Sequence, residues 1–158
     1  MRCRTVMRTF TSDPRCNVVT AVSSDNGCMR VTTKKHVFFA DDKLVGSAPC
    51  PKEYLCGALA ACAAMTLQTC YDGSRERSVF KGTAIRGWSV IVMDYYKASD
   101  PSAITPTHFS MHIAAFTEPP LSLAQIARFE RALRVCPVKN SLKQEVLVEI
   151  CSSPLSPL

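Results

Sequence analysis

The chain has 158 residues, of which 47% are hydrophobic and 20% are charged, and its formal net charge is +6. These values are typical of an ordinary globular protein. The length fits one domain that can bury its own core, so we expect a single domain over residues 1–158. The basic residues are scattered and do not alternate with aromatic residues along one stripe. We therefore expect no nucleic-acid partner.

Cysteine is the most unusual part of the composition. The nine cysteines are odd in number, no Cys-x-x-Cys pair occurs, and no apolar secretory segment precedes them. This pattern favours reduced thiols in a reducing compartment, so we expect a cytoplasmic protein without a disulfide framework. Their spacing does not supply the clustered ligands of a zinc site, and we expect no metal. The nine are Cys3, Cys16, Cys28, Cys50, Cys56, Cys62, Cys70, Cys136 and Cys151.

Residues 1–15 (MRCRTVMRTFTSDPR) have two interpretations. They are rich in Arg and Thr and contain no acid before Asp13, which resembles the composition of a mitochondrial presequence. The Thr, Val, Met and Phe of residues 5–11 also suit a first β-strand. Mitochondrial targeting is therefore the alternative to a cytoplasmic location.

The stretch from Pro51 to Tyr71 is predicted to be a long helix at the centre of the fold. Proline suits a first helical turn, mostly strong helix formers follow, and Asp72-Gly73 is a stop with Gly73 as a left-handed cap. Residues 55–67 carry no charge, so the helix is apolar on every side and is expected to be buried. The uncharged stretch from Leu55 to Tyr71 is too short and too rich in small and polar residues for a membrane span, and we expect no membrane partner.

The remaining chain predicts an α+β order of elements. Ser122, with Gln125 three residues later, is a capping box that starts a second helix, and Pro137 starts a third with Cys136 as its N-cap. This order predicts an antiparallel sheet packed on two long helices. Because such a sheet covers only one side of the 51–71 helix, we expect a second copy of the chain to cover the other side. The expected strands are residues 16–23, 29–40, 88–96, 107–116 and 144–151, with a frayed tail at 152–158.

Two motifs give the chain a family resemblance. Pro51 precedes Cys62 by eleven residues on a helix of small residues (PKEYLCGALAACAAMT), and Cys136 stands in a Cys-Pro-Val context near the C-terminus. In this order the motifs resemble the OsmC/Ohr family of thiol-dependent hydroperoxide reductases, along nearly the whole chain. The resemblance implies one OsmC-like domain and an intertwined homodimer with two long helices at its centre. It also implies that Cys62 is the peroxidatic thiol and Cys136 the resolving thiol.

The chemistry of such a pair needs no cofactor. A thiolate attacks the O–O bond of a small-molecule hydroperoxide and becomes a sulfenic acid, and a second thiol condenses with it to a disulfide. A dithiol reductant then reduces the disulfide, and a positive group near the thiolate assists the first step. We therefore expect an organic hydroperoxide reductase of the oxidative stress response, with apolar residues around Cys62. The alternative is a non-catalytic redox-sensing or apolar-ligand-binding protein.

The residues that activate the thiol in the family are only partly matched. Better-studied branches have Glu directly after the helix-starting proline, whereas this chain has Lys52 there and its acid at Glu53, an order that resembles a less characterised OsmC-like branch. Glu53 is the third candidate catalytic residue, with a favourable interaction with the helix dipole as the alternative. Arg15 and Arg30 are the arginines near the first strands that could supply the positive group. Cys136, at a helix N-cap, is expected to be the more acidic thiol of the pair.

Two groups of polar side chains are expected to be solvated. His108 and His112 share one face of a predicted strand, where a solvated surface is expected rather than a metal site. Arg128, Arg131 and Arg134 lie off the apolar stripe of the second helix, so we expect them in solvent as well.

Overall fold

The computed structural model describes residues 19–23, 29–33, 35–41, 48–74, 79–99, 102 and 105–153. The chain divides into two compact units, Met1–Pro51 and Lys52–Leu158, which we describe one at a time. Residues 1–15, with their two interpretations, and the last five residues of the tail lie outside the described residues.

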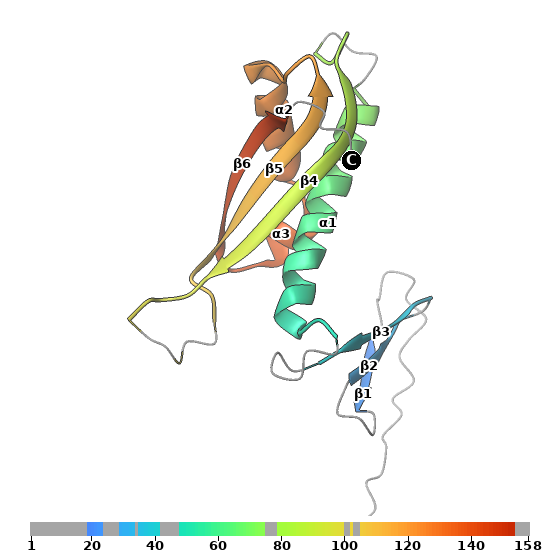
Figure 1. The fold of residues 1–158 in the computed structure, drawn as a ribbon, viewed down its shortest axis with the longest axis vertical. Coiled ribbons are helices and arrows are strands. Elements are labelled where there is room, and N and C mark those ends of the chain that lie inside the picture. The colour runs from blue at the N-terminus through green and yellow to red at the C-terminus, as the bar shows by residue number, and fades with distance from the viewer. Residues whose placement is uncertain are drawn as a thin grey trace, which may run out of the picture. The chain divides into compact units, whose positions relative to one another are not determined.

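Three short strands form the described part of the N-terminal unit. β1 (Thr20–Ser23), β2 (Met29–Thr32) and β3 (Val37–Ala40) make an antiparallel sheet in the order β1-β2-β3 (Figure 1). The prediction of one continuous strand over residues 29–40 is wrong. The Thr33 N–H donates to the His36 carbonyl at 2.9 Å, and the His36 N–H donates to the Thr33 hydroxyl at 3.0 Å. These bonds close a turn that divides the segment into β2 and β3.

The helix α1 (Pro51–Asp72) has the predicted position and length, with 22 residues. Its buried residues recur every four positions and form one stripe: Leu59, Ala63, Leu67 and Tyr71. The expectation that every side is buried is wrong for the single chain, because Met65 on another side is 70% exposed. A helix that is apolar all round therefore presents an uncovered apolar side beyond the reach of its own sheet.

The end of α1 differs from the predicted cap. Among the described residues only Gly82 has a positive φ, so Gly73 is not left-handed. Instead the Gly73 N–H continues the helical pattern and donates to the Thr69 carbonyl at 3.0 Å. The expectation that this segment is too short and too polar for a membrane span is wrong for the whole helix, because α1 is long and apolar enough to cross a membrane, as the core helix of a soluble protein also can be.

A mixed three-stranded sheet belongs to the second unit. Its strands β4 (Ala84–Tyr95), β5 (His108–Glu118) and β6 (Glu145–Ser153) lie in the order β4-β5-β6 (Figure 1). β4 pairs antiparallel with β5, but β5 pairs parallel with β6, with His108 opposite Glu145. The prediction of a purely antiparallel sheet is therefore wrong at β6. Two helices follow β5 and carry the chain back to the end of the sheet where β5 begins, so β6 runs in the same direction.

Those two helices are α2 (Leu123–Leu133) and α3 (Pro137–Ser141). The predicted capping box is confirmed. The Ser122 N–H donates to the Gln125 side chain at 2.8 Å, and the Gln125 N–H donates to the Ser122 hydroxyl. Cys136 is the N-cap of α3, as predicted, with Pro137 in the first turn. We expected a second long helix, but α2 has only 11 residues, half as many as the 22 of α1.

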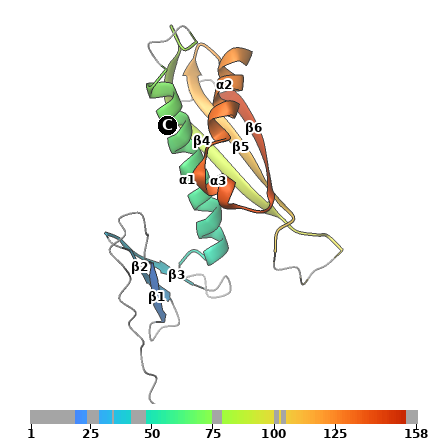
Figure 2. The same ribbon diagram turned by 180° about the vertical axis from the view of Figure 1, so that it is seen from behind.

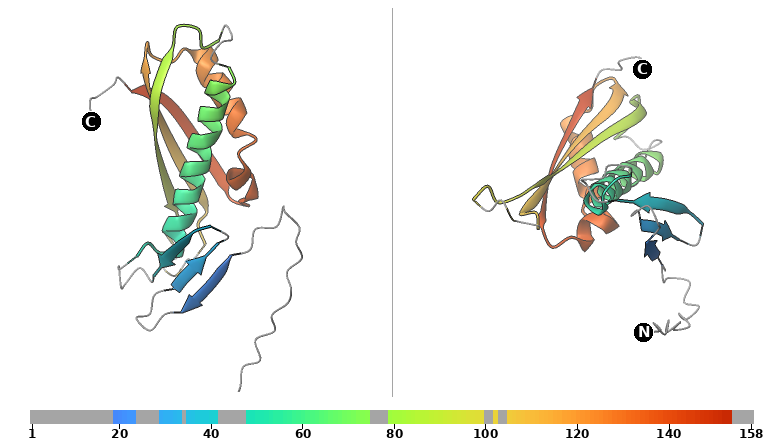
Figure 3. Two further views of the ribbon diagram at one scale, coloured as in Figure 1. Left: turned by 90° about the vertical axis from the view of Figure 1, so that its right-hand side faces the viewer. Right: turned by 60° about the horizontal axis from the view of Figure 1, so that its bottom comes forward.

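The helices of the second unit cover one face of the sheet, as Figures 2 and 3 show from behind and from the side. The α+β class is thus confirmed, as two layers with a core between them. The core joins alternate residues of β5 to the buried stripe of α1 and to α2. Its fully buried members include Leu59, Leu67, Phe80, Phe109, Met111, Ile113 and Phe129.

A buried polar network fixes the start of α2 beside the end of α1. The Gln125 amide donates to the Val79 carbonyl and to the Thr83 hydroxyl, both at 2.8 Å. The Tyr71 hydroxyl, from the last turn of α1, donates to the Thr83 carbonyl at 3.1 Å. Because unsatisfied buried polar groups are costly, this network holds the two helices in one relative position.

Phe129 offers a test of this core. Its ring is fully buried and lies 4.9 Å from the Phe80 ring and 5.1 Å from the Trp88 ring, centroid to centroid. We expect Phe129→Ala to lower the free energy of unfolding by about 3–5 kcal/mol, measured by urea denaturation. The matched control is the neighbouring Glu130→Ala, which is exposed and should change it by less than about 0.5 kcal/mol. Equal losses in the two variants would contradict the packing.

Candidate thiol site

The two cysteines singled out from the sequence meet in the second unit. Cys62 lies in the middle of α1 and Cys136 at the N-cap of α3, and their sulfur atoms are 3.3 Å apart. A disulfide bond is about 2.05 Å long, so these are two free thiols in contact. The predicted proximity of the pair is confirmed, although its members are 74 positions apart in the sequence.

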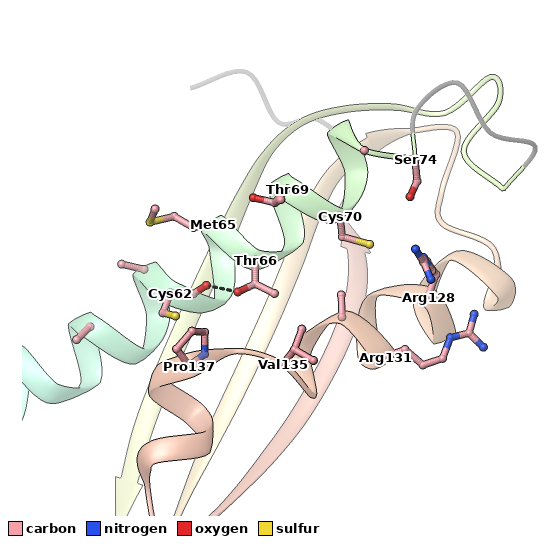
Figure 4. Close-up of a pocket in the computed structure, with 14 residues that line it drawn as sticks. Cys62, Met65, Thr66, Thr69, Cys70, Ser74, Arg128, Arg131, Val135 and Pro137 are labelled. Carbon is pink, nitrogen blue, oxygen red and sulfur yellow. Dashed lines mark hydrogen bonds between the residues drawn. The ribbon is translucent and has the colours of Figure 1, made fainter. Parts of the chain in front are cut away.

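The two thiols differ in their access to solvent. Cys136 is fully buried, whereas Cys62 is half-buried and lines a groove of about 910 Å³ (Figure 4). The groove runs between α1 and the segment from α2 to the start of α3, and Pro137 lies across from Cys62. A molecule in the groove can therefore reach Cys62 directly, while Cys136 is reachable only through Cys62 or after a local movement.

The surroundings of Cys136 keep its proton in place. Burial raises the pKa of the Cys136 thiol above its ordinary value of 9.0, and the neighbouring Cys62 sulfur raises it further. The backbone N–H of Lys139 and the Thr66 hydroxyl oppose this rise without cancelling it. The pKa of Cys136 is therefore shifted in the direction opposite to the one that its N-cap position predicted, because burial outweighs the nearby N–H. As a thiol, Cys136 donates its proton toward the Cys62 sulfur.

Thr66 is a site residue that the sequence analysis missed. It lies one helical turn after Cys62, and its hydroxyl donates to the Cys62 carbonyl at 2.8 Å, as the dashed line in Figure 4 marks. The same hydroxyl is close enough to Cys136 to affect its pKa. The four-residue spacing from Cys62 was a usable signal, since residues at that spacing share one face of a helix.

Glu53 lies in the first turn of α1, where it was expected, and it does not line the groove beside Cys62. Nine residues separate it from Cys62, which at about 1.5 Å per residue is roughly 14 Å along the helix and half a revolution around it. Its catalytic role remains a prediction.

The preceding Lys52 places its amine 4.8 Å from the centre of the Tyr96 ring, and the Tyr96 hydroxyl donates to Asp94 at 2.6 Å.

The positive charges of the groove come from α2. Arg128 and Arg131 line it at the end where Cys70 and Ser74 also lie, whereas Cys62 lies toward the other end (Figure 4). Arg131 is exposed, as expected, whereas Arg128 is half-buried, and both also border the groove. Of the two arginines proposed near the first strands, Arg30 is exposed on β2 of the other unit, and Arg15 lies outside the described residues.

The polar face of β5 shows no metal site. His112 pairs with Glu149 at 2.9 Å and lies 2.9 Å from the Ser110 hydroxyl. His108 instead stacks on the Tyr95 ring. Among the described residues, no group of three or more His, Cys, Asp or Glu side chains could hold a metal ion.

Comparison with known proteins identifies the family of this thiol site. The family model for OsmC-like proteins matches residues 44–150, so the chain belongs to the OsmC-like family. No curated protein matches it.

Solved structures agree on the fold. An OsmC-like protein from Mycoplasma pneumoniae superposes with a TM-score of 0.70 at 16% identity, covering 87% of this chain and 97% of its own. An OsmC-like protein from Vibrio cholerae gives 0.65 at 14% identity, with 85% and 97% covered. An organic hydroperoxide resistance protein from Legionella pneumophila gives 0.57 at 16% identity, with 89% and 97% covered. At these identities the similarity shows the fold alone.

The unequal burial of the two thiols predicts the order in which they react. In pulse alkylation with iodoacetamide near neutral pH, we expect Cys62 to be modified before Cys136, read residue by residue by mass spectrometry. Because the pKa of Cys136 is raised, its thiolate forms only at higher pH. Each unit by which a thiol's pKa rises lowers its thiolate fraction at neutral pH about tenfold. Faster labelling of Cys136 than of Cys62 in the native protein would contradict this arrangement.

Proposed function

We propose that this OsmC-like protein is a thiol-dependent hydroperoxide reductase with Cys62 as its peroxidatic thiol and Cys136 as its resolving thiol. One observation carries the proposal: the sulfurs are 3.3 Å apart, with Cys62 open to a groove and Cys136 buried behind it. This is the arrangement that a two-thiol reaction needs, because one sulfur must react with the oxidant and the second must lie close enough to form a disulfide with it.

In the first step the Cys62 thiolate attacks the terminal oxygen of a hydroperoxide ROOH. The S–O bond forms as the O–O bond breaks, and the alcohol ROH leaves with a proton, so that Cys62 is oxidised to a sulfenic acid. The thiol of Cys136 donates toward the Cys62 sulfur and helps to hold negative charge there before the attack.

In the second step Cys136 attacks the oxidised Cys62 sulfur. The S–S bond forms, and the sulfenic oxygen leaves as water after taking up the proton that Cys136 loses. A movement of little more than 1 Å takes the sulfurs from 3.3 Å to the bonding distance of about 2.05 Å. An external dithiol then reduces the disulfide by thiol–disulfide exchange and restores both thiols.

The lining of the groove favours an organic hydroperoxide over hydrogen peroxide. Near Cys62 it includes the Thr66 hydroxyl, which is bound to the Cys62 carbonyl, and the apolar Ala58, Ala61, Met65 and Pro137, which give a larger molecule apolar surface to cover. Solved structures with the same fold include proteins named for organic hydroperoxide resistance, which agrees with this choice of substrate class.

A second candidate function is redox sensing or apolar-ligand binding without turnover. It is favoured by the position of the groove's arginines, which lie by Cys70 and not beside Cys62 (Figure 4). A sensor needs the thiol pair but not the cation that speeds peroxide cleavage. Rates distinguish the two functions, because a sensor oxidises once whereas a reductase turns over.

The direct test is hydroperoxide consumption with dithiothreitol and cumene hydroperoxide. We expect wild type to turn over, and Cys62→Ser to fall to the uncatalysed rate because the nucleophile is gone. With dithiothreitol left out, Cys136→Ser should consume one equivalent and then stop, with Cys62 trapped as sulfenic or sulfinic acid in the mass spectrum.

The matched control for the thiol variants is Cys151→Ser, which removes an exposed cysteine of β6 that does not line the groove. It should keep the wild-type rate. Turnover that survives in Cys62→Ser would refute the assigned peroxidatic thiol, and single oxidation without turnover in wild type would favour the sensor.

We also propose that the protein acts as a homodimer. In the single chain Leu55 and Met65 of α1 are 38% and 70% exposed, an uncommon amount of apolar surface for a helix of this composition. A second copy over this side would remove that surface from water and would also cover the groove. We expect light scattering at micromolar concentration to give twice the mass of one chain. A folded, soluble single chain under those conditions would contradict the dimer.

A further inference from the structure

The outer face of the β4-β5-β6 sheet, which the helices do not cover, carries three side chains joined in a row. Ser110 and His112 are on the central strand β5, and Glu149 is on β6, directly opposite His112. The Ser110 Oγ lies 2.9 Å from the His112 Nε2, and the His112 Nδ1 lies 2.9 Å from a Glu149 carboxylate oxygen. A hydroxyl, an imidazole and a carboxylate thus follow one another in the order of the catalytic triad of serine hydrolases.

The carboxylate decides which ring nitrogen of His112 carries the hydrogen. Ionised Glu149 can only accept a hydrogen bond, so the neutral imidazole keeps its one hydrogen on Nδ1 and donates it to the carboxylate. Nε2 is then an unprotonated base, and it accepts the O–H of Ser110 at 2.9 Å. The geometry therefore places a general base on the hydroxyl of Ser110, which is the condition under which a serine becomes a nucleophile.

Ser110 is open to solvent and is bordered by apolar side chains. The side chains of its neighbours His112 and Glu149 are 44% and 71% exposed. In the sheet register Ser110 lies between Met93 of β4 and Leu147 of β6, and directly paired residues point to the same face. Both of these apolar side chains are exposed. A molecule from solvent can therefore reach Ser110 and find apolar surface on either side of it.

The outer face is separate from the thiol site and from the surface of the proposed dimer. The helices pack against the opposite face of the sheet, where Met111 and Ile113 of β5 are buried (Figures 2 and 3). A second copy over the uncovered side of α1 would lie across the sheet from Ser110 and leave it accessible. Chemistry at Ser110 is accordingly independent of hydroperoxide reduction at Cys62.

We propose that Ser110 accepts acyl groups from activated esters with a short apolar acyl chain, with His112 as its general base and Glu149 as a positioning residue. The Ser110 Oγ attacks the carbonyl carbon of the ester while its proton passes to the His112 Nε2. The bond from that carbon to the alcohol oxygen then breaks. The alcohol leaves with the proton from His112, and the acyl group remains on Ser110.

The acyl group is expected to stay on the serine. Because β5 is paired on both sides, its backbone N–H groups point to the neighbouring strands and not to a molecule that lies on the face. The oxyanion of the reaction is then stabilised by water and not by fixed donors, each of which contributes about 10²–10³-fold in an efficient hydrolase. We therefore expect a slow acylation that ends at one equivalent.

Acylation is measured with p-nitrophenyl butyrate on the full-length protein. Thiols also react with this ester, so neutral hydroxylamine is added afterwards, because it removes acyl groups from sulfur and leaves those on serine. Peptide mass spectrometry should then find one butyryl group, at Ser110. In His112→Gln, which keeps a polar side chain but has no base, the rate of labelling should fall about 100-fold.

Ser89 is the matched control for the nucleophile. It lies on the same face, on β4 and paired with Ala114, but the serine bonded to His112 is Ser110. Ser89→Ala should leave the labelling of Ser110 unchanged, whereas Ser110→Ala should abolish it. Because these side chains lie outside the core, each variant should keep the wild-type midpoint of urea unfolding, which shows that it is folded.

Glu149 acts through His112, so its test includes the tautomer of the imidazole. Ring ¹⁵N NMR of His112 should place the hydrogen on Nδ1 in wild type and show both tautomers in Glu149→Gln, with labelling about tenfold slower. A hydrogen on Nε2 in wild type would overturn the role given to Glu149.

The apolar border is tested by the length of the acyl chain. Relative to hydrolysis in buffer, the butyrate ester should label Ser110 about threefold faster than the acetate ester, and Leu147→Thr should remove this preference. An equal rate for the two esters in wild type would overturn the apolar specificity. Equal labelling of Ser89 and Ser110 in wild type, or labelling of Ser110 that persists in His112→Gln, would overturn the proposal as a whole.

Discussion

The contact between the sulfurs of Cys62 and Cys136 is the interaction on which the proposed function of this protein depends. It exists because two pieces of chain far apart in sequence pack on the same face of one sheet. α1 contributes Cys62 from a position beside its buried stripe, and the α2–α3 junction contributes Cys136 from a helix N-cap. Both placements are anchored by the core, where Leu59 and Leu67 of α1 and Phe129 of α2 are fully buried. Two thiols held 3.3 Å apart need very little rearrangement to form a disulfide.

Burial also gives the two thiols different chemical roles. Cys136 is surrounded by protein, which raises its pKa and keeps it as a proton donor, although a helix N-terminus lies beside it. Cys62 faces a groove that small molecules can enter. Thr66 links the two, since it binds the Cys62 carbonyl and lies near the Cys136 sulfur. Under the proposed function, this difference in access is what would make Cys62 the thiol that meets an oxidant and Cys136 the one that resolves it.

The uncovered apolar surface of α1 connects the groove to assembly. A helix with small residues on several sides can pack against its own sheet on one side and leave the others available. One such side forms the wall of the groove, opposite α2 with its two arginines. By its length and composition alone, this apolar helix could also cross a membrane, although α1 packs in a folded core.

The sequence by itself determined the long helix, the capping box at Ser122, the N-cap at Cys136 and the pairing of Cys62 with Cys136. Each of these depends on residues close together in the chain or on a motif that the family shares. The parallel β6, the turn within residues 29–40 and the burial that suppresses the acidity of Cys136 were decided by tertiary structure. So was the position of Arg128 and Arg131, whose place off an apolar stripe says nothing about which helix lies across from them. Local patterns specify what a segment forms, whereas the partner of each exposed face depends on how the segments pack together.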